Sequence, residues 1–321
     1  MKNFDLEIQY NDFLISSLYQ IDCLKEHNLK INHIDFSQDG SLLLSSGDDD
    51  LLCIYDIQSS QIIYLIYNKL HGTTNALFTI APDEILYCGK YDHRIILMSC
   101  ERKEVLYTFY GHKSKIIDMK LNFAKNTLLS TSDDYQTFLW NLTLKNCEAI
   151  FSSSLGGAFD SSGEIICHAK LDGNQSLILF YNRDTITKMS KPFKKFNPLQ
   201  GIVKSMQISN SGEYIVVMFD KEICIIDSDS GIINNLFKIN DTQFTVFDIS
   251  PDSNYLAIGD NMGSVSFRNV QTGKDVLNKE YHLTGCTCVK FSGEFSIFAT
   301  SSEIVMLLEP NFENRNIVSA I

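Results

Sequence analysis

A short sequence pattern returns along this chain at intervals of about 42 residues, and this period is the strongest constraint on the fold. A turn with an apolar start occurs at FSQDG (36–40), FDSSG (159–163) and ISNSG (208–212), and ISPDS (249–253) keeps the form without the glycine. Roughly twenty residues later, units end in Asp or Asn, at IYD (54–56), LWN (139–141), FYN (180–182), IID (225–227) and FRN (267–269). Intervals between these final residues are 85, which spans two units, and then 41, 45 and 42. A period of this length predicts a repeat architecture.

Each unit reads as four short strands. Between 31 and 66 the strand-like runs are INHIDF, LLLSSG, LLCIYDI and IIYLIY, separated by Asp-Gly, Asp-Asp and Ser-Ser turns. Alternating apolar residues, β-branched and aromatic residues and frequent turns are typical of antiparallel β-structure. Sustained helical periodicity is absent from the sequence. Four strands in about 42 residues correspond to one blade of a β-propeller.

The whole chain is therefore expected to form one all-β domain over 1–321, a seven-bladed propeller. The expected blades are 28–66, 67–110, 111–151, 152–200, 201–238, 239–281 and 282–312. The last blade is short by one strand, which FLISSLYQIDCL (13–24) can supply by pairing with it. This pairing closes the ring and removes an open sheet edge. Prolines and lysines in KMSKPFKKFNP (188–198) predict an exposed connector.

Composition excludes several classes of function. The 321 residues carry 39 acidic and 27 basic side chains, a formal net charge of −12. Nonspecific nucleic-acid binding needs a basic surface, so direct binding of nucleic acid is not expected. The first ten residues lack the apolar core of a signal peptide, and the chain lacks an apolar run of membrane-spanning length. The nine scattered cysteines favour reduced thiols of an intracellular protein, which we expect to be monomeric by itself.

Enzymatic and metal-binding readings have little support. The sequence lacks G-x-x-x-x-G-K-[ST], G-x-S-x-G and H-E-x-x-H, and its seven histidines include no i, i+4 pair. Cys286 and Cys288 form a single CxC without a second pair, which is too little for zinc. We expect no catalytic residue, cofactor or metal. The alternative of a propeller enzyme, with loop residues converging on the central channel, stays open from the residues alone.

The third unit resembles the WD-repeat signature. Its matching residues are Gly111-His112, Ser132, Asp134 and Trp140-Asn141, and Trp140 is the only tryptophan of the chain. In the WD-repeat family such His, Ser/Thr, Asp and Trp residues form one buried hydrogen-bond network within a blade, which the resemblance implies here. An aspartate in a tight turn needs donors if it is buried, and the other three side chains can supply or relay them.

A weaker copy occurs in the first unit. Asp49 follows His27 by 22 residues and precedes Tyr55 by six, the spacing of His112, Asp134 and Trp140. Gly47 stands where Ser132 does, so this copy is expected to keep His27 and Asp49 without a hydroxyl. In the sixth unit Met262 takes the aspartate position, and the network should be lost there. We interpret these residues as structural.

Two charged clusters each allow two interpretations, one as ordinary solvated surface and one as a binding site for a partner. Asp48, Asp50 and Asp133 fall in turns that lead into the third strand of their blades. They are either solvated turn residues or an acidic rim that binds Lys or Arg of a partner peptide. KPFKKF (191–196) is either a solvated loop or a contact for an acidic or phosphorylated tail.

A closer resemblance extends over about 13–312. The stretches KINHIDFSQDGSLLLSSGDDDLLCIYDIQSSQ (30–61), YTFYGHKSKIIDMKLN (107–122) and ISPDSNYLAIGDNMGSVSFRNVQTGK (249–274) carry it. They resemble the family of WD-repeat subunits shared by COMPASS-type histone H3 lysine-4 methyltransferase complexes and RNA 3′-end processing or protein phosphatase 1 assemblies. Blade four and the ending IVMLLEP (304–310) depart from that pattern.

That resemblance implies a nuclear, non-catalytic scaffold. Its implied partners are a SET-domain histone methyltransferase subunit and other complex subunits, with the RNA polymerase II tail and a protein phosphatase 1 regulator as further partners. A second role in transcription termination is implied with the phosphatase module. The alternative is a WD-repeat adaptor of another complex, such as a ubiquitin-ligase receptor or a ribosome assembly factor.

Overall fold

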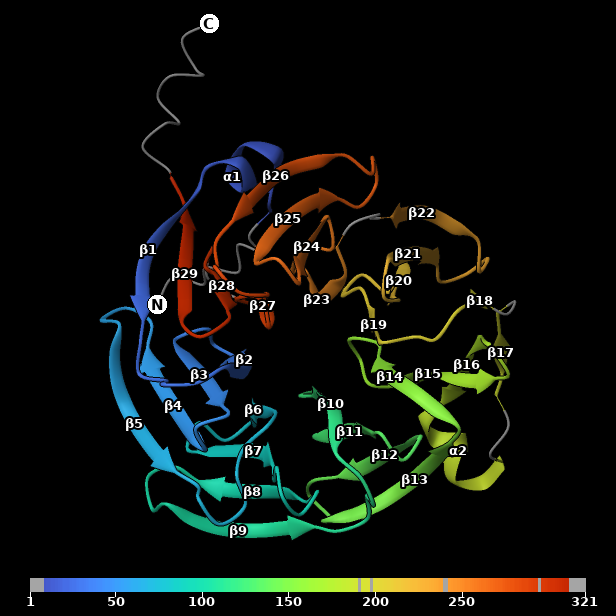
Figure 1. The fold of residues 1–321 in the computed structure, drawn as a ribbon. Coiled ribbons are helices and arrows are strands. Elements are labelled where there is room, and N and C mark those ends of the chain that lie inside the picture. Colours follow the sequence, from blue (N-terminus) through green and yellow to red (C-terminus); the bar gives the residue numbers. More distant parts are fainter. Residues whose placement is uncertain (1–8, 190–191, 197–198, 239–241, 294–295, 312–321) are drawn as a thin grey trace, which may run out of the picture.

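Seven small antiparallel sheets radiate from a common axis in the computed structural model (Figure 1). The structure describes residues 9–189, 192–196, 199–238, 242–293 and 296–311. The first and last residues of the expected domain, 1–8 and 312–321, lie outside the described residues. The predicted fold class, a seven-bladed all-β propeller, is confirmed.

Blades one to three each contain four strands that are neighbours in chain order. Blade one holds β2 (Ile31–Phe36), β3 (Leu42–Gly47), β4 (Leu51–Asp56) and β5 (Gln61–Tyr67). Blade two holds β6 (Ala76–Phe78), β7 (Glu84–Cys88), β8 (Ile95–Ser99) and β9 (Glu104–Phe109). Blade three holds β10 (Ile116–Asn122), β11 (Thr127–Ser132), β12 (Gln136–Asn141) and β13 (Asn146–Ser152).

Blades four to seven continue the same order, with two exceptions. Blade four has a fifth strand, and blade seven takes its fourth strand from the start of the chain. Blade four holds β14 (Ser154–Phe159), β15 (Ile165–Asp172), β16 (Gln175–Asn182), β17 (Lys194–Lys195) and β18 (Leu199–Gln200). Blade five holds β19 (Ser205–Ile208), β20 (Tyr214–Met218), β21 (Glu222–Asp227) and β22 (Ile233–Lys238). Blade six holds β23 (Phe244–Ile249), β24 (Tyr255–Asp260), β25 (Ser264–Asn269) and β26 (Asp275–Glu280). Blade seven holds β27 (Cys288–Phe291), β28 (Phe298–Ser301), β29 (Val305–Pro310) and β1 (Leu18–Leu24).

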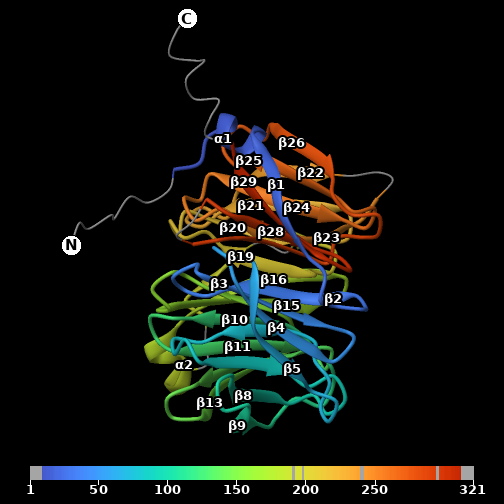
Figure 2. The same cartoon turned by 90° about the vertical axis from the view of Figure 1, so that its left-hand side faces the viewer.

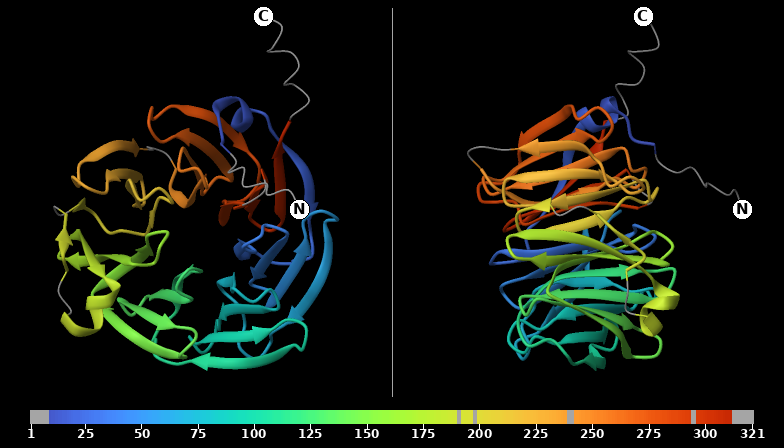
Figure 3. Two further views of the ribbon diagram at one scale, coloured as in Figure 1. Left: turned by 180° about the vertical axis from the view of Figure 1, so that it is seen from behind. Right: turned by 90° about the vertical axis from the view of Figure 1, so that its right-hand side faces the viewer.

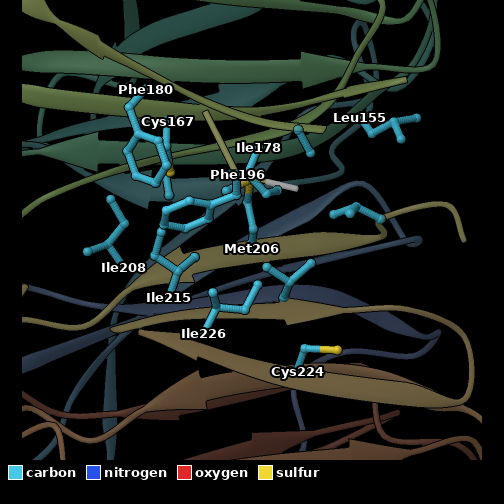
Figure 4. Close-up of a cluster of buried hydrophobic side chains, with 14 of the residues drawn as sticks. Leu155, Cys167, Ile178, Phe180, Phe196, Met206, Ile208, Ile215, Cys224 and Ile226 are labelled. Atoms are coloured by element: carbon cyan, nitrogen blue, oxygen red, sulfur yellow. The ribbon is translucent and has the colours of Figure 1, made fainter. Parts of the chain in front are cut away.

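Neighbouring blades cover the inner strands of each blade on both faces, which explains why these strands are continuous apolar runs. Seven clusters of buried side chains lie between adjacent blades and together form a closed ring of core. Figure 4 shows the cluster between blades four and five, where Met206 meets Ile178 and Phe196. Strands buried on both faces need not alternate apolar and polar residues. Outer strands such as β5 and β22 are mostly exposed, although β5 is itself an apolar run.

The ring is closed by the start of the chain, as the sequence predicts. β1 pairs with β29 in antiparallel register from Leu18 opposite Pro310 to Leu24 opposite Val305. Figure 2, which views the disc from its edge, shows β1 crossing the rim beside the C-terminal blade. The expected strand over 13–24 is too long, however, because helix α1 (Asp12–Ser16) precedes β1.

Helix α1 forms because it buries two adjacent apolar side chains on one side. Asn11 caps it by accepting the amide of Leu14 at 2.9 Å. Leu14 and Ile15 are both buried, whereas adjacent residues of a strand would point to opposite faces. Tyr255 of blade six donates its hydroxyl to Asp12 at 2.6 Å, so residues 10–24, here called the N-terminal latch, tie blade six to blade seven.

The expected exposed connector at 188–198 is also only partly correct. Helix α2 (Arg183–Met189) follows β16, and β17 pairs Lys194 with Phe180. The Lys194 ammonium donates to the carbonyl of Ser228 and lies over the rings of Phe180 and Phe196. Residues 190–191 and 197–198 lie outside the described residues. An ordered contact with blade five therefore occupies Lys194.

Strand direction divides the loops between two faces of the disc. In an antiparallel blade, the turn between the second and third strands lies at the same end as the connection to the next blade. These turns and connections, including 48–50, 68–75, 92–94, 110–115 and 133–135, form what we call the connection face. The remaining turns form the opposite face, and Figure 3 shows the disc from behind and from its other edge.

Candidate functional site

Four side chains of blade three meet beneath the connection face. His112 comes from the connection after β9, Ser130 from β11, Asp134 from the turn after β11, and Trp140 from β12. His112 Nε2 and Trp140 Nε1 each lie 2.8 Å from Ser130 Oγ. His112 Nδ1 lies 3.3 Å from an Asp134 carboxylate oxygen. The His112 side chain is 1% exposed, so these hydrogen bonds join three chain segments away from solvent.

Hydrogen-bond chemistry assigns the protons of this network. Burial opposes ionisation of Asp134, but the amide of Lys113 and the neighbouring His112 outweigh it and lower the pKa of Asp134. A charged carboxylate can only accept, so His112 donates from Nδ1 and accepts the Ser130 hydroxyl proton at Nε2. Ser130 Oγ then accepts the indole N–H of Trp140. Burial lowers the pKa of His112, which keeps the imidazole neutral at pH 7.

The hydroxyl in this network comes from Ser130, and the prediction of Ser132 is wrong. Ser132 Oγ instead donates to the carbonyl of Ser114 at 3.0 Å and accepts the amide of Asp134 at 3.2 Å. Ser130 and Ser132 point to the same side of β11, so alternation alone does not separate them. Ser130 lies one pair of residues deeper in the blade, where the imidazole of His112 meets the indole of Trp140.

Blade one contains a fuller copy than its sequence indicates. His27 Nδ1 lies 2.9 Å from Asp49, and His27 Nε2 lies 2.8 Å from the hydroxyl of Ser45. The expectation that this blade lacks a hydroxyl is wrong, because it rests on aligning Gly47 with Ser132. Ser45 follows His27 by 18 residues, as Ser130 follows His112, and this spacing is the sequence signal that identifies both serines.

Two further blades keep part of the arrangement. In blade two, His71 Nδ1 lies 2.7 Å from Asp92, and Tyr87 occupies the register position of the serine. In blade seven, His282 Nε2 lies 3.1 Å from Thr300 Oγ1, again 18 residues apart, and no aspartate follows at the turn. The same histidine position thus fastens a blade connection to its own blade in four blades. The arrangement provides cohesion rather than a reactive group presented to solvent.

The three candidate partner-binding aspartates differ in how far contacts within the protein leave their carboxylates accessible to a partner. Asp48 forms a 2.9 Å ion pair with Lys90 of blade two and accepts from the side chain of Asn32. Asp50 accepts a hydroxyl bond from Tyr91 at 3.4 Å. Asp133 is exposed. Asp48 is therefore committed to joining blades one and two, and Asp133 is the most accessible of the three.

The axis of the propeller contains a cavity of about 1160 Å³. One residue from the first strand of each blade lines it at the corresponding register position. These residues are Asp35, Leu77, Lys120, Ala158, Gln207, Asp248 and Lys290. Two aspartates and two lysines give this ring a formal charge of zero.

Charges in the axial ring compensate one another across blades. Lys290 Nζ lies 3.9 Å from Asp35. Asp248 and Asp35 together raise the pKa of Lys290, although burial of the ammonium opposes this shift. Burial raises the pKa of Asp35 to about 6, although Lys290 opposes this shift. Asp35 accepts the amide of Phe78 in blade two, and Asp248 accepts the amide of Phe291 in blade seven. Each carboxylate is thereby bound to the neighbouring blade.

Other groups that could carry chemistry are dispersed in the described part of the chain. No group of three or more His, Cys, Asp or Glu side chains with metal-binding geometry occurs among the described residues. All nine cysteines are free thiols, and Cys286 and Cys288 are buried. Helices long and apolar enough to cross a membrane do not occur among the residues that the structure describes.

Comparison with known proteins matches the repeat geometry. Segments 18–56 and 103–141 match the family model described as WD domain, G-beta repeat. The first segment contains β1 to β4, and the second contains β9 to β12 with the network of His112 and Trp140. The chain therefore contains WD40 repeats.

Several curated proteins are similar to this chain over most of its length. WD repeat-containing protein 82 of Drosophila melanogaster is 27% identical, covering 92% of this chain and 95% of its own. The Set1 complex component swd2 of Schizosaccharomyces pombe is 26% identical, covering 76% and 72%. The COMPASS component SWD2 of Saccharomyces cerevisiae is 25% identical, covering 86% and 89%. Coverage of both partners in each comparison agrees with one propeller of similar size.

Proposed function

We propose that this WD40-repeat propeller is a non-catalytic scaffold subunit of a nuclear, COMPASS-type complex that methylates histone H3 at lysine 4. One observation carries the proposal: two proteins named as Set1 or COMPASS components are similar to the chain over 76% and 86% of its length. The partner of the scaffold would be the SET-domain methyltransferase subunit, together with other subunits of the complex.

Rigidity is the physical contribution that a closed propeller makes to such a complex. The latch and the axial ring fix the last blades to the first from outside and inside. A loop held on such a ring loses little freedom when a partner binds, so less of the interaction free energy is spent on ordering the receptor. A disordered partner segment can then be ordered on a surface that itself does not change.

The family resemblance supports a second role in transcription termination and RNA 3′-end processing. In that role the chain would join a protein phosphatase 1 regulator, and the RNA polymerase II tail would be a further partner. The rival assignment is an adaptor in another complex, such as a ubiquitin-ligase receptor or a ribosome assembly factor. These assignments differ in the proteins that bind the propeller and not in its fold.

Cross-linking mass spectrometry of the tagged chain from nuclear extract separates these assignments. We expect cross-links to a SET-domain protein, and they should be confined to a few neighbouring blades. A tagged propeller of an unrelated complex serves as the control for abundant nuclear proteins. Recovery of ubiquitin-ligase or ribosome-assembly subunits without any SET-domain protein would contradict the proposal.

A further inference from the structure

The outer strand of blade one, β5, presents an edge with unused backbone groups. It is the last strand of its sheet, which runs in the order β2-β3-β4-β5. The amide of Asn68 donates to the carbonyl of Asp50 at 2.8 Å, and this bond fixes which residues of β5 are hydrogen-bonded to β4. Because antiparallel pairs alternate, the backbone N–H and C=O groups of Leu65 and Tyr67 point away from β4. Within the described part of the chain, these outward groups have no hydrogen-bond partner.

The strand β5 also differs from the outer strands of the other blades in charge. Its sequence, QIIYLIY, contains no charged residue. A bulge near its middle recurs in the outer strands of blades two, three, five and six, so the bulge does not set β5 apart. Charged side chains protect a strand edge from pairing with another chain. Each other blade has such a residue in its outer strands, and from blade two to blade seven these include Glu104, Glu148, Lys194, Lys238, Asp275 and Asp22.

Apolar side chains border this edge on both faces of the sheet, at the outside of the disc (Figure 1). Tyr64 and Ile66 pack toward blade two, whereas Leu65 packs toward blade seven. Ile63 is 45% exposed and Tyr67 is 61% exposed. Alternate side chains of a strand added here would turn to the same two faces. Such a strand would therefore gain apolar contacts as well as backbone hydrogen bonds.

Two ionised carboxylates lie at the end of β5 where the strand begins. The Ser60 side chain hydrogen-bonds to Asp22 of β1 and lowers the pKa of this carboxyl. Asp56 lies opposite Gln61, and a hydrogen bond from the Ser59 hydroxyl lowers its pKa as well. Hydrogen bonds from uncharged groups account for both shifts, and neither carboxylate has an ion-pair partner among the described residues. Both negative charges thus remain available to a partner.

We propose that the edge of β5 takes up one extended segment of another protein as a fifth strand of blade one. This segment is apolar and uncharged along β5 and carries a lysine or arginine beside Gln61. Its backbone bonds the outward groups of Leu65 and Tyr67. Its cation lies near Asp22 and Asp56. The net charge of −12 on each chain opposes a second copy as the occupant. The inference rests on the scaffold function and names the docking site and chemistry of one partner.

Hydrogen exchange followed by mass spectrometry tests this edge before the partner is known. The tagged full chain is measured in the complex purified from nuclear extract and again after purification alone. The fragment that contains Leu65 and Tyr67 should exchange at least about tenfold more slowly in the complex. Equal exchange in both states would overturn the proposal, whether the edge is open in both or covered in both. Exchange that slows as the free chain is concentrated would assign the edge to a second copy and overturn it too.

Two substitutions with matched controls separate strand addition from other contacts. Tyr67→Pro removes an outward N–H and leaves the hydrogen bonds to β4 in place, whereas Tyr67→Ser removes the same ring and keeps the N–H. Ile63→Lys places a charge on the edge of β5, and Val105→Lys places one on β9, where Val105 is 51% exposed. Urea unfolding followed by Trp140 fluorescence verifies that the four variants are folded.

In their complexes, Tyr67→Ser and Val105→Lys should keep the protection of β5 within about threefold, whereas Tyr67→Pro and Ile63→Lys should lose it. Protection that survives Tyr67→Pro would mean that side chains alone hold the partner, and strand addition would be wrong. Equal loss in Val105→Lys would likewise contradict the assignment to β5. Asp22→Asn with Asp56→Asn should reduce the protection, and an unchanged value would refute the cation. The subunits present in the complex test the SET-domain proposal separately.

Discussion

Replacing Ser130 by alanine removes one hydroxyl that serves two buried ring nitrogens. The indole N–H of Trp140 loses its acceptor, and Nε2 of His112 loses its donor. Ser130 is 0% exposed and Trp140 is 4% exposed, so water has no ready access to either nitrogen. A buried polar group left without a partner costs about 1–3 kcal/mol, which gives a loss of about 2–5 kcal/mol for the pair.

Two matched substitutions calibrate this loss. Ser45→Ala in blade one leaves only His27 Nε2 without its partner, so the expected cost is about 1–3 kcal/mol. Ser132→Ala loses two backbone partners, Ser114 and Asp134, that are both only partly buried. Water can replace much of what those groups lose, so Ser132→Ala should cost less than Ser130→Ala.

Urea denaturation followed by fluorescence measures the effect directly, because Trp140 is the only tryptophan. Far-UV circular dichroism on the same samples tests whether blade three unfolds with the rest. A loss of about 3 kcal/mol should lower the urea midpoint by roughly 1 M at unchanged slope. A change for Ser130→Ala below about 0.5 kcal/mol, which is ordinary for a surface position, would refute the shared-hydroxyl network. A larger loss of stability for Ser132→Ala than for Ser130→Ala would favour Ser132, the residue predicted from the sequence, as the hydroxyl of the network.

Three further outcomes follow from the geometry. Burial lowers the pKa values of His168 and His282 to about 4, so the unfolded chain binds more protons between about pH 4 and 6.5, and stability should rise with pH over that window. In urea titrations at several pH values His282→Gln should flatten this rise, and an unchanged slope would contradict it. Gly47→Ser introduces the residue that blade three has at the corresponding position, Ser132. It should nevertheless lower the stability of the protein by about 1–3 kcal/mol, because a Cβ at this position lies 2.5 Å from His27 Nδ1. Equal urea midpoints for the variant and the unmodified chain would refute this. Ile15→Ala, at a fully buried latch position, should cost about 2–5 kcal/mol in the same assay, and a negligible loss would mean that the latch contributes little.

Elements set by local sequence could be predicted well. The four strands of blade one lie at or within a residue of their predicted positions, because Asp-Gly, Asp-Asp and Ser-Ser turns separate the apolar runs. Ring closure could also be predicted, because a seventh blade with three strands leaves an edge to be paired. Helix α1 was missed because its signal is a cap and only two apolar residues, too short for a periodic pattern.

Features that depend on contacts between blades could not be read from the sequence. The Lys90–Asp48 ion pair joins residues 42 positions apart, and it removes an aspartate that looks available when blade one is read alone. The axial ring depends on the register of seven first strands, which becomes visible only when all are aligned around one axis. Ser130 rather than Ser132 completes the network because depth within the blade decides the contact, and residue type does not distinguish them.

The N-terminal latch has a consequence for synthesis of the chain on the ribosome. Tyr19 in β1 bonds Glu309, 290 residues later, so the earliest strand waits for the last strand to be made. At roughly 5–20 residues per second, this wait is roughly 15–60 s, during which an apolar strand edge has no native neighbour. The nascent protein should therefore depend on holding factors until translation ends, and a stop codon shortly before Val305 should yield a product that associates with other chains instead of a smaller ring.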